Sequence, residues 1–234
     1  MASLIEQAKK KAAYQAVDEH VLDSHKVIGV GSGSTVVYVV ERLLQRDAAV
    51  NAKTVFVPTS FQSRGLLIDG GLSVGDVEQY PDIDVTIDGA DEVDEHLNAI
   101  KGGGGAHLQE KVVAEAAKKF VIVADFRKNS KYLGEQGVPI EVVPMAWKAV
   151  LRKLQAMGSS TAKLRMAVAK AGPVVTDNSN FIIDAPFGLI KNPAQLLKDI
   201  KLITGVVEVG LFCDMAEIAY FGNEDGSVSI RSKP

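Results

Sequence analysis

Residues 101–111 place a run of glycines between a cation and a carboxylate. The segment begins with Lys101, continues through Gly102 to Gly105, and reaches Glu110. Successive glycines lose much conformational entropy when they are ordered, so a structural role alone explains the run poorly. The glycines would let the backbone wrap closely around a ligand, with Lys101 and Glu110 beside it. Glu110 could equally be a favourable first-turn charge of a helix, which is the commonest role for such a glutamate.

His107 lies in the same segment and could act as a base, although a histidine beside a loop is more often polar surface. The other histidines are His20, His25 and His96, and their spacing is not that of metal ligands.

A second polar segment reads Asp88-Gly89-Ala90-Asp91-Glu92. Asp88 and Asp91 stand three residues apart on a glycine turn, where they could hydrogen-bond sugar hydroxyls, exchange protons or bind a divalent metal. The alternative is a solvated acidic loop in which Asp91 caps a helix. The alternating aspartates of a calcium loop are absent from this segment.

The third segment is Gly31-Ser32-Gly33-Ser34-Thr35. Its glycines allow a tight turn, while backbone amides at a helix start and three hydroxyls offer hydrogen-bond donors to a phosphate. The glycine spacing is not that of a dinucleotide fingerprint, and no Lys-Ser or Lys-Thr pair follows as in a Walker loop. An ordinary strand-to-helix turn remains the alternative.

These three segments must be positioned by the elements around them. Short apolar runs with β-branched residues predict strands at residues 27–30, 55–58, 85–88 and 120–124. Helix-like stretches lie between them at residues 35–45, 62–68 and 108–118. This alternation predicts an α/β fold, a Rossmann-like parallel sheet flanked by helices. Function in such sheets gathers at the loops that leave the carboxyl ends of the strands.

The pattern changes after Gly134. Residues 139–143, 162–168 and 181–184 look like strands, and residues 145–155 and 193–200 look like helices. We therefore expect a catalytic α/β domain of residues 1–134 plus 206–234, with an inserted, smaller α+β domain of residues 135–205. The smaller domain would serve as a lid or an oligomer interface. Residues 217–231 alternate around Asn223 to Gly226, which predicts a hairpin.

Composition narrows the class of protein. A net charge of −3 and a pI near 5.8 argue against a nucleic-acid binder. The single cysteine, Cys213, excludes an internal disulfide and lies in an apolar run, where a buried structural thiol is expected. Residues 1–11 lack the apolar stretch of a signal peptide, and no window has the length of a membrane span. We expect a cytoplasmic protein with no membrane partner.

Taken together, the three segments resemble the type A ribose-5-phosphate isomerase family. The Asp-Gly-Ala-Asp-Glu and Lys-Gly-Gly-Gly blocks in this order are highly specific, whereas the Gly-Ser-Gly-Ser-Thr turn is shared with related sugar-phosphate folds. The resemblance covers essentially the whole chain, in residues 29–35, 58–60, 87–92, 100–104, 124–128, 139–145, 174–178 and 205–212.

The resemblance implies a role for each segment. Glu110 matches the catalytic base, Asp88 and Asp91 the carboxylates that face the sugar oxygens, and Lys101 the cation of a second substrate loop. The substrate-binding residues that it implies are Ser32, Gly33, Ser34, Thr35, Asp88, Gly89, Ala90, Asp91, Lys101, Gly102, Gly103, Gly104 and Lys128. Departures from the family pattern are a fourth glycine, Gly105, and Ser179 in place of glycine; neither is at a catalytic position.

The implied activity is the interconversion of ribose 5-phosphate and ribulose 5-phosphate in the pentose phosphate pathway. It requires no cofactor and no metal, and its partner is a small sugar phosphate. The family also suggests a homodimer or homotetramer. A sugar-phosphate sensor would need a DNA-binding helix-turn-helix, for which the first strand begins too early. A metal-dependent hydrolase or a dehydrogenase would need a ligand cluster or a dinucleotide fingerprint, and the sequence has neither.

Overall fold

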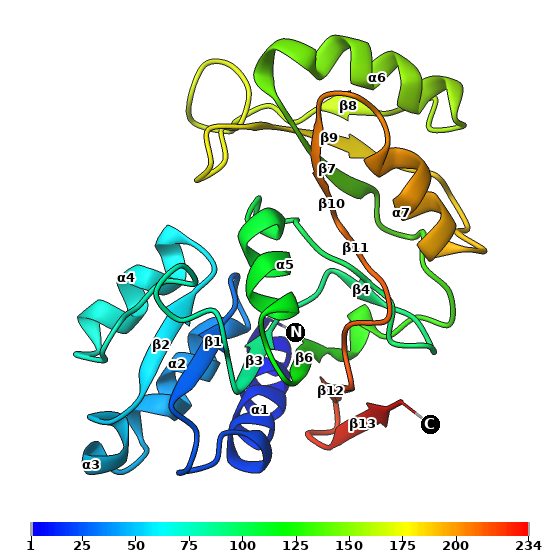
Figure 1. The fold of residues 1–234 in the computed structure, drawn as a ribbon. Helices are drawn as coiled ribbons and strands as arrows, with labels where there is room; N and C mark the ends of the chain where they lie inside the picture. Colours follow the sequence, from blue (N-terminus) through cyan, green and yellow to red (C-terminus); the bar gives the residue numbers. More distant parts are fainter. Residues whose placement is uncertain (1, 234) are drawn as a thin grey trace. The chain divides into compact units, whose positions relative to one another are not determined.

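The computed structural model describes residues 2–233, which form two compact units (Figure 1). Among the described residues, unit 1 consists of residues 2–90, 109–129 and 214–233, and unit 2 of residues 91–108 and 130–213. Contacts therefore group residues 91–108 and 206–213 with unit 2. The domain boundaries expected from the sequence lie between residues 134 and 135 and between residues 205 and 206. They remain a prediction about which parts of the chain form separate domains.

Unit 1 is built on a sheet with the strand order β13-β12-β6-β3-β1-β2. The neighbouring pairs from β2 to β12 are parallel, and β13 closes the edge as the antiparallel partner of β12. The strands are β1 (Val27–Val30), β2 (Val55–Pro58), β3 (Val85–Asp88), β6 (Phe120–Asp125), β12 (Ile218–Gly222) and β13 (Val228–Ser232). The chain order reverses between β1 and β3, the position at which ligands bind in open α/β sheets.

Helices cover both faces of this sheet, as the alternation of side chains along the strands requires. Ile28 and Val30 of β1 pack with α1 and α2 in one apolar cluster. On the other face, Val113 of α5 packs on Val57 in a second cluster. The helices are α1 (Ala2–His20), α2 (Val36–Leu44), α3 (Ala48–Asn51), α4 (Phe61–Asp69) and α5 (His107–Glu115), with the 3-10 turn η1 (Phe126–Lys128).

Unit 2 combines an antiparallel sheet, β10-β7-β9-β8, with a small sheet, β11-β5-β4. Side chains of α6 and α7, such as Val150 and Ile200, pack in one core with Ile140 and Val142 of β7. The elements are β4 (Glu92–Val93), β5 (Ala99–Ile100), β7 (Val138–Val142), η2 (Pro144–Ala146), α6 (Trp147–Ala156), β8 (Lys163–Leu164), β9 (Phe181–Ala185), α7 (Pro193–Lys201), β10 (Val206–Val209) and β11 (Leu211–Phe212).

The predicted α/β architecture is confirmed, with differences at several elements. The strand expected at residues 162–168 is only Lys163–Leu164, and the helix expected at 108–118 is His107–Glu115. The predicted hairpin is confirmed by the antiparallel pairing of β12 with β13. The alternative in which Asp91 caps a helix is wrong, because the residue directly precedes β4. No helix among residues 2–233 is both long enough and apolar enough to cross a membrane.

Candidate active site

Backbone amides of the loop after β1 hold it against β3, the neighbouring strand in the sheet. The Gly31 amide donates to Ile87 O at 3.0 Å, and the Ser32 amide donates to Asp88 Oδ1 at 3.0 Å. A Cβ on Gly31 would lie 1.9 Å from Asp88 Oδ1, so only glycine allows this approach. Residues Ser32 and Asp88, which the sequence placed in separate candidate segments, are therefore in direct contact.

A network of hydroxyl groups continues from this loop into the loop after β2. Ser32 Oγ lies 2.7 Å from Thr59 Oγ1 and donates to Ser60 Oγ at 2.6 Å. Ser60 also caps α4 by accepting from the Ser63 amide. Gln62, in the first turn of α4, accepts a hydrogen bond from the Gly33 amide at 2.8 Å. The loop after β2 thus fixes the shape of the candidate phosphate loop.

Lys9 of α1 brings a cation to this loop. Its Nζ donates to Ser34 Oγ at 3.0 Å and to Glu6 Oε1 at 2.8 Å, and the residue is buried. Hydrogen bonds from Lys9 and Tyr38 lower the pKa of Glu6, so this carboxylate is ionised beside Lys9 at neutral pH. Lys9 is absent from the candidates drawn from the sequence. Thr35, the last residue of the candidate phosphate loop, is buried at the start of α2.

Asp88 ends β3 with its side chain fully buried. Its Oδ1 accepts from the Gly89 amide at 2.6 Å as well as from Ser32, so two backbone donors meet one carboxylate oxygen. These two bonds fix the orientation of the Asp88 carboxyl group. Gly89 and Ala90 follow directly and complete the part of this loop that belongs to unit 1.

Glu110 occupies the first turn of α5, as the sequence predicts, but it is buried rather than solvated. Helix α5 precedes β6, which is parallel to β3, so its first turn lies toward the carboxyl ends of the strands. Thr86 Oγ1 donates to Val113 O at 3.3 Å, which packs α5 onto β3. A buried first-turn glutamate at this edge is suited to proton transfer in a way that an exposed helix charge is not.

Lys128 ends η1, directly after β6, and its side chain is half-buried. Burial would raise the pKa of the neighbouring Asp125, but the Arg127 guanidinium, 2.7 Å away, and the Lys128 charge hold it below its usual value. Loops after β1, β3 and β6 therefore all carry candidate residues of unit 1 at the same edge of one sheet.

In unit 2, Asp91 and the glycine loop are joined directly. The Gly103 amide donates to Asp91 Oδ2 at 2.7 Å, and a Cβ on Gly103 would lie 2.7 Å from Asp91 Oδ1. Gly102 and Gly105 have φ values of 105° and 79°, which favour glycine, and the Gly105 amide donates to Gly102 O at 3.0 Å. The glycine run is therefore a closed turn folded against a carboxylate.

Lys101 enters this loop from β5. Its amide donates to Gly210 O at 2.9 Å, its side chain is buried, and its Nζ lies 5.3 Å from the centre of the Phe212 ring. A buried ammonium over an aromatic face keeps its position without being exposed to bulk water.

The interpretation of His107 as polar surface is wrong, because its side chain is fully buried. Its ring packs under the loop, 2.6 Å from where a Cβ on Gly102 would lie, and its Nε2 is 3.9 Å from Glu141 Oε2. Burial raises the pKa of Glu141, against the opposing effect of hydrogen bonds from Thr176 and Asn180. His107 thus supports the glycine loop from inside unit 2.

Among residues 2–233, no group of three or more His, Cys, Asp or Glu side chains is arranged to hold a metal ion.

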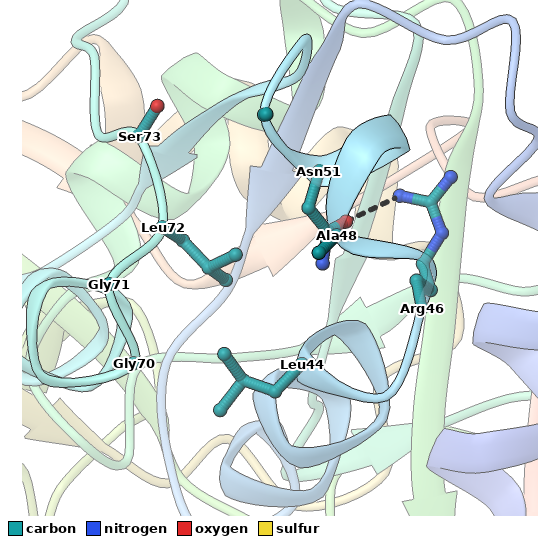
Figure 2. Close-up of a pocket in the computed structure, with 9 residues that line it drawn as sticks. Leu44, Arg46, Ala48, Asn51, Gly70, Gly71, Leu72 and Ser73 are labelled. Carbon is teal, nitrogen blue, oxygen red and sulfur yellow. Dashed lines mark hydrogen bonds between the residues drawn. The ribbon is translucent and has the colours of Figure 1, made fainter.

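Unit 1 has a cavity of about 230 Å³, shown in Figure 2. It lies between Arg46, which donates to Asn51, and the side chains of Leu44 and Leu72. The cavity lies where α2 and α4 end and thus toward the amino ends of the strands, away from the candidate loops.

Comparisons with known proteins show the family to which the chain belongs. A family model described as ribose 5-phosphate isomerase A (phosphoriboisomerase A) matches residues 55–226. A relative from Mycosarcoma maydis, named ribose-5-phosphate isomerase, is 63% identical over 233 residues, which cover 97% of this chain and 82% of the relative. The chain belongs to the ribose 5-phosphate isomerase A family.

Solved structures support the same membership. The structure of ribose 5-phosphate isomerase A from Methanocaldococcus jannaschii is 40% identical, with a TM-score of 0.90 over 97% of this chain and 99% of the other. A D-ribose-5-phosphate isomerase described in complex with phospho-erythronic acid is also 40% identical, with a TM-score of 0.89 and the same coverage.

Proposed function

We propose that this member of the isomerase A family interconverts D-ribose 5-phosphate and D-ribulose 5-phosphate through an enediolate, in the non-oxidative pentose phosphate pathway. The observation that carries the proposal is identity of 63% over nearly the full chain to a protein named ribose-5-phosphate isomerase. The acidic, glycine-rich and phosphate-loop segments needed for the reaction are all present.

The phosphate of the substrate binds at Ser32, Gly33, Ser34 and Thr35. Backbone amides and hydroxyls supply the hydrogen-bond donors, and Lys9, 3.0 Å from Ser34 Oγ, supplies the positive charge. Lys128 adds a second cation from the loop after β6. Binding energy gained at the phosphate fixes the position of the reacting carbons, which are remote from it.

The carbon chemistry needs one base that removes and returns a proton. The Glu110 carboxylate takes the proton from C2 of the open-chain aldose, and the electron pair forms the enediolate. Lys101 and the amides of Gly102 and Gly104 stabilise the negative oxygen, while the Gly103 amide holds Asp91. A proton moves between the oxygens, and the Glu110 carboxyl returns its proton to C1, which gives the ketose. No electron leaves the substrate, so these side chains supply all the chemistry without a redox cofactor.

Asp88 and Asp91 face the sugar oxygens in this proposal. Asp88 assists ring opening and proton exchange at the oxygens, and Gly89 and Ala90 shape the loop between the two carboxylates. The phospho-erythronic acid bound by one related isomerase carries both a phosphate and a carboxylate. Both groups of that ligand are anionic, and anions are what the donors assigned above would bind.

We also assign the protein to the cytoplasm and expect a homodimer or homotetramer, in which residues 135–205 act as a lid or an interface. Met145 and Leu202 in unit 2 are 93% and 85% exposed, and an interface between copies would cover such apolar side chains. Light scattering during size-exclusion chromatography tests the oligomeric state. A net charge of −3 gives no support to a nucleic-acid partner.

The direct test is to incubate the purified protein with ribose 5-phosphate and to measure ketose formation. Rapid conversion to an equilibrium mixture supports the proposal. Absence of conversion by a folded protein would overturn it.

A further inference from the structure

One peptide of the glycine loop is held at both of its polar ends. The carbonyl of Gly102 accepts from Arg165 Nη1 at 2.9 Å, and the amide of Gly103 donates to Asp91 Oδ2 at 2.7 Å. These two groups belong to the same peptide unit. In a trans peptide they point in opposite directions, so Arg165 and Asp91 hold one peptide plane from opposite sides.

Arg165 is itself held firmly. Its Nε and Nη2 donate to the two carboxylate oxygens of Asp184 at 2.9 Å and 2.5 Å, a bidentate pair. Its backbone amide donates to Ile182 O, and its carbonyl accepts from the Val174 amide. With the side chain only 17% exposed, the guanidinium has a fixed position from which Nη1 reaches the loop.

The same nitrogen also donates to Gly103 O at 3.0 Å, so the guanidinium binds two successive carbonyls. A run of glycines has more backbone freedom to lose than any other sequence, and each such bond offsets part of that entropy. The backbone of Gly102 packs closely on the His107 ring, since a Cβ at Gly102 would lie only 2.6 Å from His107 Nδ1. This packing limits movement of the loop toward His107. The arginine therefore selects one conformation of a segment whose sequence specifies none.

We propose that Arg165, oriented by Asp184, is a positioning residue for the reaction, acting through the Gly102–Gly103 peptide to hold the Asp91 carboxylate. The inference rests on the proposed function, in which Asp91 faces the sugar oxygens. Arg165 also places its positive charge beside the carbonyl oxygens of Gly102 and Gly103, which are the negative ends of two peptide dipoles. A lysine cannot replace it, since one ammonium group cannot bind a carboxylate bidentately and two carbonyls in a plane.

The test is a double-mutant cycle with Arg165→Lys and Asp91→Asn, followed by kcat and KM for ribose 5-phosphate. We expect Arg165→Lys to lower kcat by about 10- to 100-fold, as misplacement of a reacting group by up to 1 Å does. In the Asp91→Asn background the same change should lower kcat little further, because the residue it positions is already lost. Inorganic phosphate should inhibit every variant with an unchanged constant, since the phosphate loop is untouched.

Arg152→Lys, an exposed arginine of α6, is the matched control and should leave kcat unchanged. If Arg165→Lys does not fold, Asp184→Asn replaces it in the cycle. It should lower kcat in the wild-type background and lower it little further in the Asp91→Asn background. Normal turnover of folded Arg165→Lys, or multiplicative effects in the cycle, would overturn the inference. If Asp91→Asn alone has normal turnover, the role of Asp91 in the proposed function fails instead, and the positioning role fails with it.

Discussion

The contact between Gly31 and Asp88 gives a prediction whose size follows from the structure. A methyl group added at residue 31 would lie 1.9 Å from Asp88 Oδ1 and 2.0 Å from Asp88 Cγ. To move from 1.9 Å to an ordinary contact distance of 3.4 Å, the carboxylate would have to retreat by about 1.5 Å. Asp88 is fully buried, so its retreat would disturb the loops after both β1 and β3.

Two hydrogen bonds would weaken as Asp88 moves, those from the amides of Ser32 and Gly89. Hydrogen bonds to a charged group contribute about 1.5 to 3 kcal/mol each, and overpacking adds about 1 to 3 kcal/mol. We expect Gly31→Ala to lower the free energy of unfolding by about 2 to 4 kcal/mol, since part of each bond survives relaxation. A shift of this size in a group that contacts substrate should lower kcat about 100-fold.

Urea unfolding and an assay of ketose formation measure the two effects. The matched control is Gly65→Ala in the interior of α4, where an added Cβ meets nothing within 4 Å. It should raise stability by about 0.5 to 1 kcal/mol and leave kcat unchanged. A Gly31→Ala protein with normal stability and normal turnover would refute the reasoning, because Asp88 could then move freely without cost.

Three further predictions concern charge and metal. Lys101→Ala should lower kcat by about 100-fold or more, whereas Ser32→Ala should act mostly on KM; the reverse pattern in steady-state kinetics would mean that the two loops have exchanged roles. Turnover should survive dialysis against EDTA, and a loss restored by one divalent ion would make Asp88 a metal ligand. Burial would raise the pKa of Asp84, but hydrogen bonds from Lys118 and two backbone amides outweigh it and lower that pKa to about 2, from 3.8. The ionised Asp84 therefore stabilises the folded state fully above its unfolded pKa of 3.8, and this stabilisation is lost as the pH falls through its folded pKa of about 2. Asp84→Asn should lower the free energy of unfolding by about 1 to 2 kcal/mol at pH 7 and by little near pH 2. Equal destabilisation at both pH values in urea titrations would contradict the assignment.

The sequence predicted the sheet of unit 1 well because each strand is a short apolar run followed by a polar loop. The rule that function gathers at carboxyl ends then placed residues 31–35 and 88–90 at one edge, and the structure confirms that Ser32 contacts Asp88. Strands β4 and β5 went unpredicted, because two residues carry no periodic signal. Their pairing depends on contacts between segments far apart in the chain.

The residues that the sequence did not reveal act through tertiary contacts. Lys9 is one of three consecutive lysines, and only the packing of α1 determines which of them reaches Ser34. Arg165 follows a strand of ordinary composition, and its bonds to the glycine loop span more than sixty residues of sequence. The burial of His107 is hidden in the sequence for the same reason, since nothing in its neighbours indicates that its ring is covered.

The role of Glu110 as the base is the central claim, and Glu110→Gln tests it most directly. The substitution keeps the shape of the side chain and removes the proton acceptor. The variant should bind ribose 5-phosphate nearly as the wild type does, while turnover falls about 100- to 10,000-fold. In deuterated water, the wild type should exchange the migrating carbon-bound hydrogen and the variant should not. A folded Glu110→Gln protein with near-normal turnover and exchange would contradict the claim, and the base would have to be Asp88, Asp91 or His107.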